Sequence, residues 1–226
     1  MPRTLNELLE TDESAWPLVR SWIAQAKNPV EVLPSSPTAG SELEAAQIAV
    51  RSPLGAIVYH TGGILIDHGW VRILGSGHPR LPRTLMGWNR GRTVDYTGYA
   101  RGHMLVADDV VGGFFALNGG AFGADAGNVY YFAPHTLRWE PLNRGYTDFL
   151  RFCLDGDLAG YYSTSRWLGW ASESATIGGD QAFALSPPPW TPEGKDISKC
   201  LRKPAPLADL YASVINLPNH GGGQPT

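Results

Sequence analysis

Two short groups of acidic and imidazole side chains are the residues of this chain that are best suited to chemistry. Asp67 precedes His68, Asp108 precedes Asp109, and His103 lies shortly before the second pair. Each pair falls at a predicted strand end or turn, where side chains from different strands can converge. A carboxylate that meets His68 or His103 could hold the imidazole as a general base or a metal ligand. Aspartate is also common in turns because it bonds its own backbone, and this turn chemistry alone is enough to explain these positions.

An arginine-rich segment between Leu74 and His103 is the second candidate site. Guanidinium groups there could bind an acidic protein or a phosphate-bearing ligand through charge-assisted hydrogen bonds. An ordinary solvated loop would have the same composition. Residues 89–102 are polar, glycine-rich and aperiodic, which favours a mobile excursion. The segment contains Arg80, Arg83, Arg90, Arg92 and Arg101, a single acid, Asp95, and the interleaved Tyr96 and Tyr99.

The motifs of familiar enzyme classes are missing from the sequence. Gly75, Ser76 and Gly77 begin like a dinucleotide fingerprint, but Arg80 stands where the third glycine belongs. The chain has no phosphate-binding loop, no nucleophile elbow and no histidine pair at helical zinc spacing. Cys153 falls on an apolar helical stripe, where a thiol behaves as a small hydrophobe and its pKa rises. We therefore predict no catalytic residue, no metal site and no cofactor.

The composition predicts a globular protein with a sizeable core. The chain has 226 residues, of which 43% are hydrophobic and 17% are charged, and its net charge is −3. This charge gives no general attraction to nucleic acid or to an anionic membrane. No apolar run is long enough to span a bilayer, and the amino-terminal residues lack the apolar stretch of a signal peptide. Cys153 and Cys200 are too few for a disulfide framework, and we expect reduced thiols in the cytoplasm.

A strand meander followed by one helix is the most regular part of the pattern. Short apolar runs separated by turn residues predict strands over 103–107, 114–117, 129–132 and 137–142. Tyr146, Phe149, Leu150, Cys153 and Leu154 then recur at the spacing of one helix face. Such an order of strands and helix is typical of an α+β protein with a mainly antiparallel or mixed sheet.

The remaining elements extend this arrangement to both ends of the chain. We predict helices over 16–26, 42–50 and 207–215, a strand over 30–33, a hairpin of 64–66 with 70–74, and a strand over 182–185. An aromatic-rich helical stretch contains Trp167, Trp170 and Ile177. Residues 54–59 are ambiguous between helix and buried strand, and residues 60–63 are predicted to break the chain. Apolar patterns cross every candidate boundary, which indicates one domain over residues 1–217 and a flexible tail over 218–226.

Several long segments of the chain resemble a bacterial family known as domain of unknown function 2625. The resemblance runs from about Arg3 to Leu217. It is carried by residues 4–34, 51–77, 105–120, 127–142 and 145–158, with strings such as RSPLGAIVYHTGGILIDHGWVRILGSG and LVADDVVGGFFALNGG. The family supplies no established catalytic residues that could be assigned to this chain.

The middle of the chain is also similar, more loosely, to the SUKH superfamily of cell-wall regulators and toxin-immunity proteins. The shared pattern leads from Leu81-Pro82 to Trp88-Asn89, then to a glycine-rich strand at 112–117, a further strand and the helix at 146–154. This likeness implies an α+β domain whose sheet presents a protein-binding surface and has no catalytic role. The chain departs from the pattern in residues 89–102 and in its longer carboxy-terminal third from Trp167 onward.

Three functions are compatible with these observations. The first is a non-enzymatic domain that binds a protein partner, with a toxin as one candidate, through a sheet edge or face and the arginine-rich segment. The second is a small-molecule binder or hydrolase-like enzyme that uses the Asp and His groups at strand ends. The third is a homo-oligomer that has only a structural role. An enzyme would need a concave pocket in which the polar groups converge, whereas a binding module would offer a flatter, aromatic-rich surface.

Overall fold

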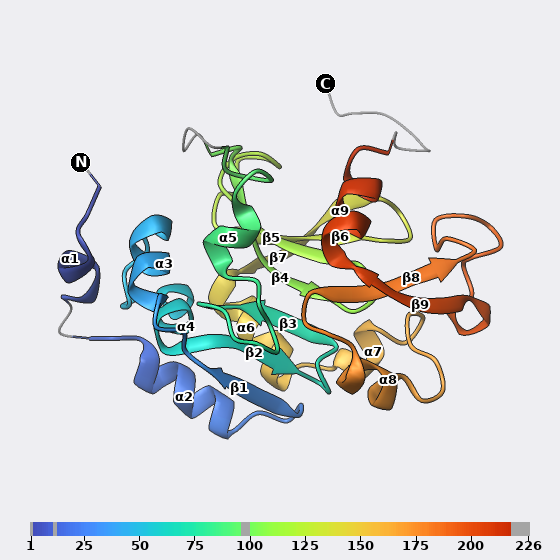
Figure 1. Ribbon diagram of the computed structural model, residues 1–226, viewed down its shortest axis with the longest axis horizontal. Coiled ribbons are helices and arrows are strands. Elements are labelled where there is room, and N and C mark those ends of the chain that lie inside the picture. The colour runs from blue at the N-terminus through green and yellow to red at the C-terminus, as the bar shows by residue number, and fades with distance from the viewer. Residues whose placement is uncertain (1, 11–12, 96–99, 218–226) are drawn as a thin grey trace.

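A seven-stranded antiparallel sheet forms the centre of the protein in the computed structural model, which describes residues 2–10, 13–95 and 100–217 (Figure 1). The strands follow one another in chain order across the sheet, so each pairs with its neighbours in sequence. They are β1 (Val30–Pro34), β2 (Thr61–Ile66), β3 (Val71–Leu74), β4 (His103–Asp109), β5 (Phe114–Asn118), β6 (Asn128–Ala133) and β7 (Arg138–Gly145). A second sheet pairs β8 (Gln181–Ser186) with β9 (Leu201–Pro206).

Helices connect and cover these strands. Four precede the second strand or separate it from the first: α1 (Leu5–Leu9), α2 (Trp16–Ala24), α3 (Ala39–Ala46) and α4 (Pro53–His60). α5 (Leu85–Asn89) lies between β3 and β4. After β7 the described chain continues through α6 (Tyr146–Asp155), α7 (Leu158–Tyr161), α8 (Trp170–Thr176), a short 3-10 helix (Ile197–Lys199) and α9 (Leu207–Ile215). The expected α+β class and the antiparallel meander are confirmed.

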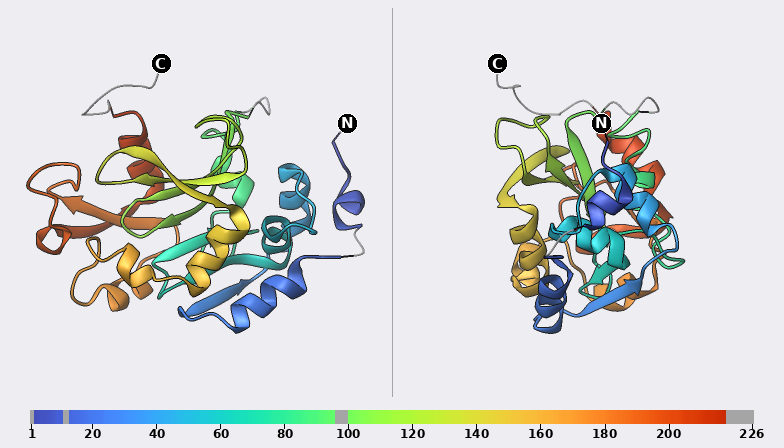
Figure 2. Two further views of the ribbon diagram at one scale, coloured as in Figure 1. Left: turned by 180° about the vertical axis from the view of Figure 1, so that it is seen from behind. Right: turned by 90° about the vertical axis from the view of Figure 1, so that its left-hand side faces the viewer.

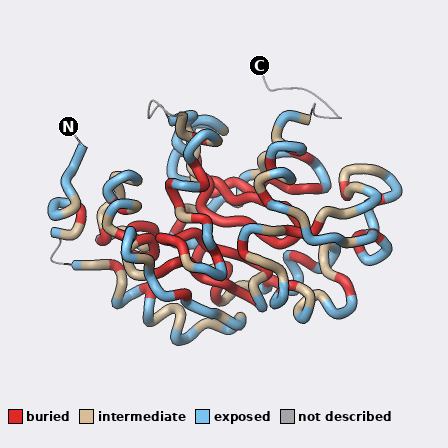
Figure 3. The backbone as a smooth tube through the Cα atoms, viewed as in Figure 1, coloured by how far each residue is buried: buried red, intermediate tan, exposed pale blue. Residues whose placement is uncertain are grey.

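The central sheet is covered on both faces (Figure 2). α6 and α7 lie on one face, which we call the α6 face, and α9 with the β8–β9 sheet lies on the other, the α9 face. Side chains alternate between the two faces along each strand. Phe115 of β5 therefore packs on Phe149 of α6, while its neighbour Phe114 packs on Tyr211 of α9. Buried residues are concentrated in β2 to β6 (Figure 3), and one core cluster contains residues from Leu8 to Val214.

The helix predicted after the meander forms as its spacing requires. All five residues of the apolar stripe, from Tyr146 to Leu154, are buried in α6. Phe149 lies against Phe115 with ring centroids 4.8 Å apart. Cys153 is 1% exposed within this stripe, and burial raises the pKa of its thiol. The aromatic-rich stretch after α7 contains α8, as predicted.

The structure resolves one open expectation for residues 54–63 and corrects another. The ambiguous apolar run is helical: Ser52 accepts a hydrogen bond from the Gly55 amide, and Pro53 occupies the first turn. The predicted break is wrong for residues 61–63, which begin β2. Glycine is needed there because the backbones approach closely, and a Cβ on Gly62 would lie 2.5 Å from the Pro34 carbonyl oxygen. β9 is an unexpected strand, since Pro204 and Pro206 conceal its pattern.

The first part of the expected mobile excursion is anchored to the core. Asn89 is fully buried, and its amide nitrogen donates to the carbonyl oxygens of Leu85 and Leu105, each at 2.8 Å. The Leu105 amide in turn donates to the Asn89 side-chain oxygen at 2.8 Å. Thr93 is also buried and bonds Asn89. Asn89 therefore ties the arginine-rich segment to β4. The predicted tail, residues 218–226, lies outside the described residues.

Candidate functional site

The Asp67–His68 pair forms a tight turn between β2 and β3. Asp67, His68 and Gly69 all have positive φ, at 53°, 60° and 78°, and the Trp70 amide donates to the Asp67 carbonyl at 3.1 Å. Turns of this hand match the twist of an antiparallel hairpin. Positive φ is costly for residues other than glycine. The backbone at Asp67 and His68 is therefore held in a strained conformation that surrounding contacts must support.

The Asp67 carboxylate is engaged by Arg166. The two side chains form an ion pair and are 11% and 9% exposed, respectively. The Arg166 guanidinium also stacks on aromatic rings, at 3.8 Å from the Trp170 centroid and 4.9 Å from that of Trp70. Cation–π contacts of this kind are strongest where water is excluded. Asp67 therefore fixes the segment between α7 and α8 onto the hairpin turn.

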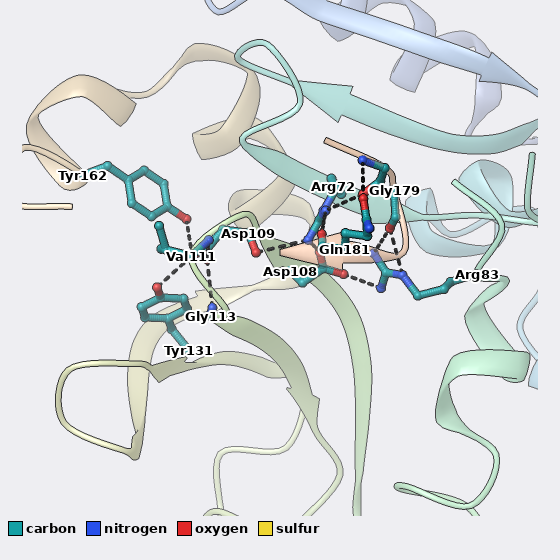
Figure 4. A network of polar contacts seen from close by, with 11 residues as sticks. Arg72, Arg83, Asp108, Asp109, Val111, Gly113, Tyr131, Tyr162, Gly179 and Gln181 are labelled. Carbon is teal, nitrogen blue, oxygen red and sulfur yellow. Dashed lines mark hydrogen bonds and ion pairs between the residues drawn. The ribbon is translucent and has the colours of Figure 1, made fainter. Parts of the chain in front are cut away.

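Asp108 is the centre of a buried ionic cluster (Figure 4). Its Oδ1 accepts a hydrogen bond from Arg72 Nε at 2.6 Å, and its Oδ2 accepts one from Arg83 Nη1 at 2.5 Å. Arg72 lies directly opposite Asp108 in the β3–β4 register, so the two side chains emerge next to each other on the α9 face. Asp108 is fully buried, and such a charge is tolerated only when it is paired.

The same two arginines hold the carboxy-terminal third of the chain against the sheet. Arg72 Nη1 donates to the Gln181 carbonyl at 2.5 Å, and Arg83 donates to the Gly179 carbonyl at 2.7 and 3.0 Å. Gly179 packs against the backbone at Arg80, where an added Cβ would lie 2.1 Å from the carbonyl oxygen. The cluster thus joins β3, β4 and the segment that leads from α8 into β8.

Asp109 points to the opposite face and stabilises the β4–β5 turn. Its Oδ1 accepts from the amides of Val111 and Gly113 at 3.1 and 2.8 Å. Its Oδ2 accepts from the hydroxyls of Tyr131 at 2.7 Å and Tyr162 at 3.2 Å (Figure 4). Burial raises the pKa of the Asp109 carboxyl, although these donors oppose the shift. All its close partners are internal to the fold.

A cavity of about 520 Å³ opens beside the hairpin turn on the α9 face. Leu65 and Arg72 contribute to it from β2 and β3, His68 and Gly69 from the turn, and residues 174–180 from the end of α8 and the segment after it. The rim carries an ion pair between Arg80 and Glu31, whose side chains are 53% and 51% exposed. The exposed His68 lines the same cavity and meets the edge of Trp170 at 5.9 Å between ring centroids.

The structure brings the two acidic pairs to one end of the sheet. Val71, which follows the hairpin turn, lies opposite Asp109 in the register. The hypothetical contact between Asp108 and an imidazole is not formed, because both Asp108 oxygens are taken by arginines. His103 lies at the far end of β4, opposite Asn118.

At that far end, His103 is surrounded by aromatic rings, with Phe122 at 4.9 Å and Trp139 at 5.7 Å between ring centroids. Burial lowers the pKa of His103. The middle of the arginine-rich segment lies near this end of β4, since Asn89 bonds Leu105.

Of the described arginines of this segment, Arg80 lines the cavity and Arg83 bonds Asp108, whereas Arg90, Arg92 and Arg101 do not line it. Arg92 stacks on Trp88 at 3.8 Å and on Tyr211 at 5.7 Å, and it donates to the Trp88 carbonyl at 2.9 Å. Arg90 and Arg101 are exposed. The Arg101 amide donates to the Thr93 carbonyl at 2.7 Å. Tyr96 and Tyr99 lie outside the described residues.

Sequence reasoning missed the roles of Arg72, Arg83 and Arg166. The available signal was Arg72 itself, a charged residue inside the apolar strand VRIL, which needs a buried counter-charge. Arg83 belongs by sequence to the arginine-rich segment, yet it is only 9% exposed. Nothing in the local sequence indicates that Arg166 contacts Asp67, which lies far from it along the chain.

A metal-binding group and a membrane-spanning helix are both absent from the part of the chain that the structure describes. Within residues 2–10, 13–95 and 100–217, no group of three or more His, Cys, Asp or Glu side chains is arranged to hold a metal ion. Among the helices of that same part, none has the length and apolar character needed to cross a membrane.

Comparison with known proteins identifies relatives over most of the chain. The family model described as protein of unknown function DUF2625 matches residues 5–210. The uncharacterized protein YbfG of Escherichia coli (strain K12) is 44% identical over 189 residues, which cover 83% of this chain and 86% of that protein. An uncharacterized protein of Haemophilus influenzae (strain ATCC 51907 / DSM 11121 / KW20 / Rd) is 42% identical over 186 residues, covering 82% of each chain. No solved structure gives a significant match. The chain therefore belongs to the DUF2625 family, as the resemblance of its long sequence segments implied.

Proposed function

We propose that this protein is a non-enzymatic protein-binding domain of the SUKH-like kind, and that the rim of the cavity beside His68 contacts its partner. The proposal rests on one observation, which is that the carboxylates at the strand ends bond other groups of the protein itself. Asp67 bonds Arg166, and Asp108 bonds Arg72 and Arg83. Asp109 is surrounded by amide and phenol donors. A general base needs an oxygen directed at its substrate, whereas these oxygens hold the fold together.

The character of the cavity rim supports a contact with another macromolecule. Glu31, Arg80 and Asp180 place charges of both signs around an opening whose inner wall includes Leu65. Charged rims of this kind direct partner choice through complementarity more than they add affinity. The SUKH-like assignment is supported by the antiparallel strands followed by α6, the order that the looser resemblance implies. A toxin remains the candidate partner that this resemblance suggests.

A small-molecule ligand is the second candidate function. The cavity volume of about 520 Å³ falls within the range of small-ligand sites, which is about 300–1,000 Å³. His68 has no hydrogen-bond partner among the described residues, so its imidazole is available to a ligand. Under this alternative, a metabolite would occupy the cavity and a protein partner would not depend on its rim.

Site-specific photocrosslinking in cells of the source organism separates the two functions. A benzophenone amino acid is placed at Thr176, an exposed residue of the cavity rim, and in a matched control at Asp148, an exposed residue of α6 on the other face. We expect a discrete protein adduct from Thr176 and not from Asp148. The crosslinked protein is then purified, and its affinity is measured for wild type and for Thr176→Trp. Equal adducts from both positions, no adduct from Thr176, or an affinity unchanged by Thr176→Trp would refute the proposal.

A further inference from the structure

β1 forms one outer edge of the central sheet, and the cavity begins at this strand. The sheet order ends at β1, so only β2 pairs with it. Pro29, Val30 and Glu31 line the cavity together with Leu65 of β2. We infer that an extended segment of the partner protein adds to the sheet alongside β1 and extends over the cavity rim. This inference rests on the proposed function and specifies its partner surface.

The register determines which backbone groups of β1 face outward. The Asp67 amide donates to the Pro29 carbonyl at 2.7 Å, so Pro29 faces β2. In an antiparallel pair, inward and outward residues alternate. Glu31 and Leu33 therefore also bond β2, while Val30 and Val32 direct their N–H and C=O groups away from the sheet. No other described residue hydrogen-bonds these outward groups.

β1 is more open to an added strand than the other edges of the described sheets. Glu31 and Val32 are exposed, and the prolines at this strand stand at its ends, Pro29 before it and Pro34 as its last residue. β7, at the opposite edge, contains Pro141 in its interior. β9 contains Pro204 and ends on Pro206. Proline removes a donor from the ladder in β7 and β9, and the Phe183 amide of β8 already donates to the Val110 carbonyl at 2.7 Å, so β1 is the edge left most open.

Charge favours a basic partner segment over a second copy of this chain. Two copies of β1 could pair with each other in antiparallel fashion. If this pairing used all the outward groups of Val30 and Val32, Glu31 would lie opposite Glu31 of the other copy. Like charges that face each other across a strand pair are destabilising. A lysine or arginine at that position of a partner strand would instead face the Glu31 carboxylate, which stays half-exposed beside its ion pair with Arg80. The same added residue would project from the α9 face toward the cavity, as Glu31 does.

A random-dodecapeptide library displayed on phage tests this inference while the partner is still unidentified. Peptides are selected on wild type, synthesised and titrated against three variants. Val32→Pro removes an outward N–H without breaking the β1–β2 ladder, Val32→Thr is the control that keeps the N–H, and Glu31→Lys reverses the charge. We expect selected peptides with a basic residue, an affinity at least about tenfold weaker for Val32→Pro, little change for Val32→Thr, and acidic peptides from selection on Glu31→Lys. Thermal unfolding confirms that each variant is folded.

Three outcomes would overturn strand addition: no enriched peptide, peptides that bind Val32→Pro as well as wild type, or a wild-type dimer that Val32→Pro converts to a monomer. The photocrosslinking at Thr176 distinguishes these from a failure of the proposed function. A partner that crosslinks at Thr176 but binds Val32→Pro normally would leave the cavity rim as the contact surface and remove β1 from it. Absence of any Thr176 adduct would refute both the proposed function and strand addition at β1.

Discussion

Arg72 of β3 lies opposite Asp108 of β4, and its Nε donates to the Asp108 carboxylate at 2.6 Å in the interior of the protein. Arg83 bonds the second oxygen of the same carboxylate. Because both arginines also bind carbonyl groups of residues 178–181, this single acid links the central sheet to the carboxy-terminal third. The cavity wall formed by that third depends on the same link.

Asp108→Asn should destabilise the protein strongly. The amide cannot balance two buried guanidinium charges, and loss of one partner of a buried ion pair costs about 3–5 kcal/mol. The free energy of unfolding from urea titration measures this loss. Glu31→Gln, which breaks the exposed pair with Arg80, is the control and should cost about 1 kcal/mol or less. A loss for Asp108→Asn no larger than for this control would show that the buried cluster does not hold the fold together.

Asp109→Asn should change how stability depends on pH. Burial raises the pKa of Asp109 above its ordinary value of 3.8, so the folded protein keeps a proton that the unfolded chain has already released. Between the ordinary and the raised pKa, the contribution of Asp109 to stability therefore falls as pH rises. We expect wild type to lose stability relative to Asp109→Asn as the pH rises from about 4 to about 8. The free energies of unfolding of both proteins over this range measure the change. A difference that is constant, or that shifts in favour of wild type, contradicts the raised pKa.

His68→Gly should stabilise the protein while it weakens partner binding. His68 has a φ of 60°, which glycine adopts without strain, and we expect a gain of about 0.5–1 kcal/mol despite the lost contact with Trp170. Asp67→Gly is the matched control, because it relieves a similar φ but breaks the ion pair with Arg166 and should be destabilising. Thermal and urea unfolding of both variants test the pair. A destabilised His68→Gly would mean that the imidazole supports the turn and is not held ready for a partner.

Cys153→Ser should lower stability by about 1–3 kcal/mol, because it places a hydroxyl on the apolar stripe of α6. Cys153→Ala is the control that separates the lost volume from the added polarity. Burial raises the pKa of this thiol, so a thiol reagent should modify the folded protein only slowly. A serine variant as stable as wild type would argue against core placement, and rapid modification of the native thiol would show that it is accessible.

Local patterns predicted much of the fold but few of the contacts that build the site. The stripe from Tyr146 to Leu154 and the alternating strands were predictable because each pattern follows from the period of one element. Gly62 looks like part of a break in the sequence because its role, close approach to Pro34, depends on a strand distant in sequence.

The contacts of the candidate site could not be predicted for the same reason, since they join segments that lie far apart in the sequence. Asp67, His68, Asp108 and Asp109 lie at one end of the sheet, but Asp108 and Asp109 point to opposite faces and bond other groups. Their partners Arg83 and Arg166 come from segments whose placement no local period specifies. His103 could not be excluded from the group without the direction of β4, which carries it to the other end.

The claim that these acids build a scaffold for binding is tested most directly by one comparison of affinities. The partner captured at Thr176 is titrated into wild type, Thr176→Trp and Asp109→Asn, each confirmed as folded. We predict that Thr176→Trp weakens binding by at least about tenfold, or about 1.4 kcal/mol, while Asp109→Asn binds almost as wild type does. Normal binding by Thr176→Trp together with a loss in Asp109→Asn would contradict the account and would assign the functional role to the buried carboxylate.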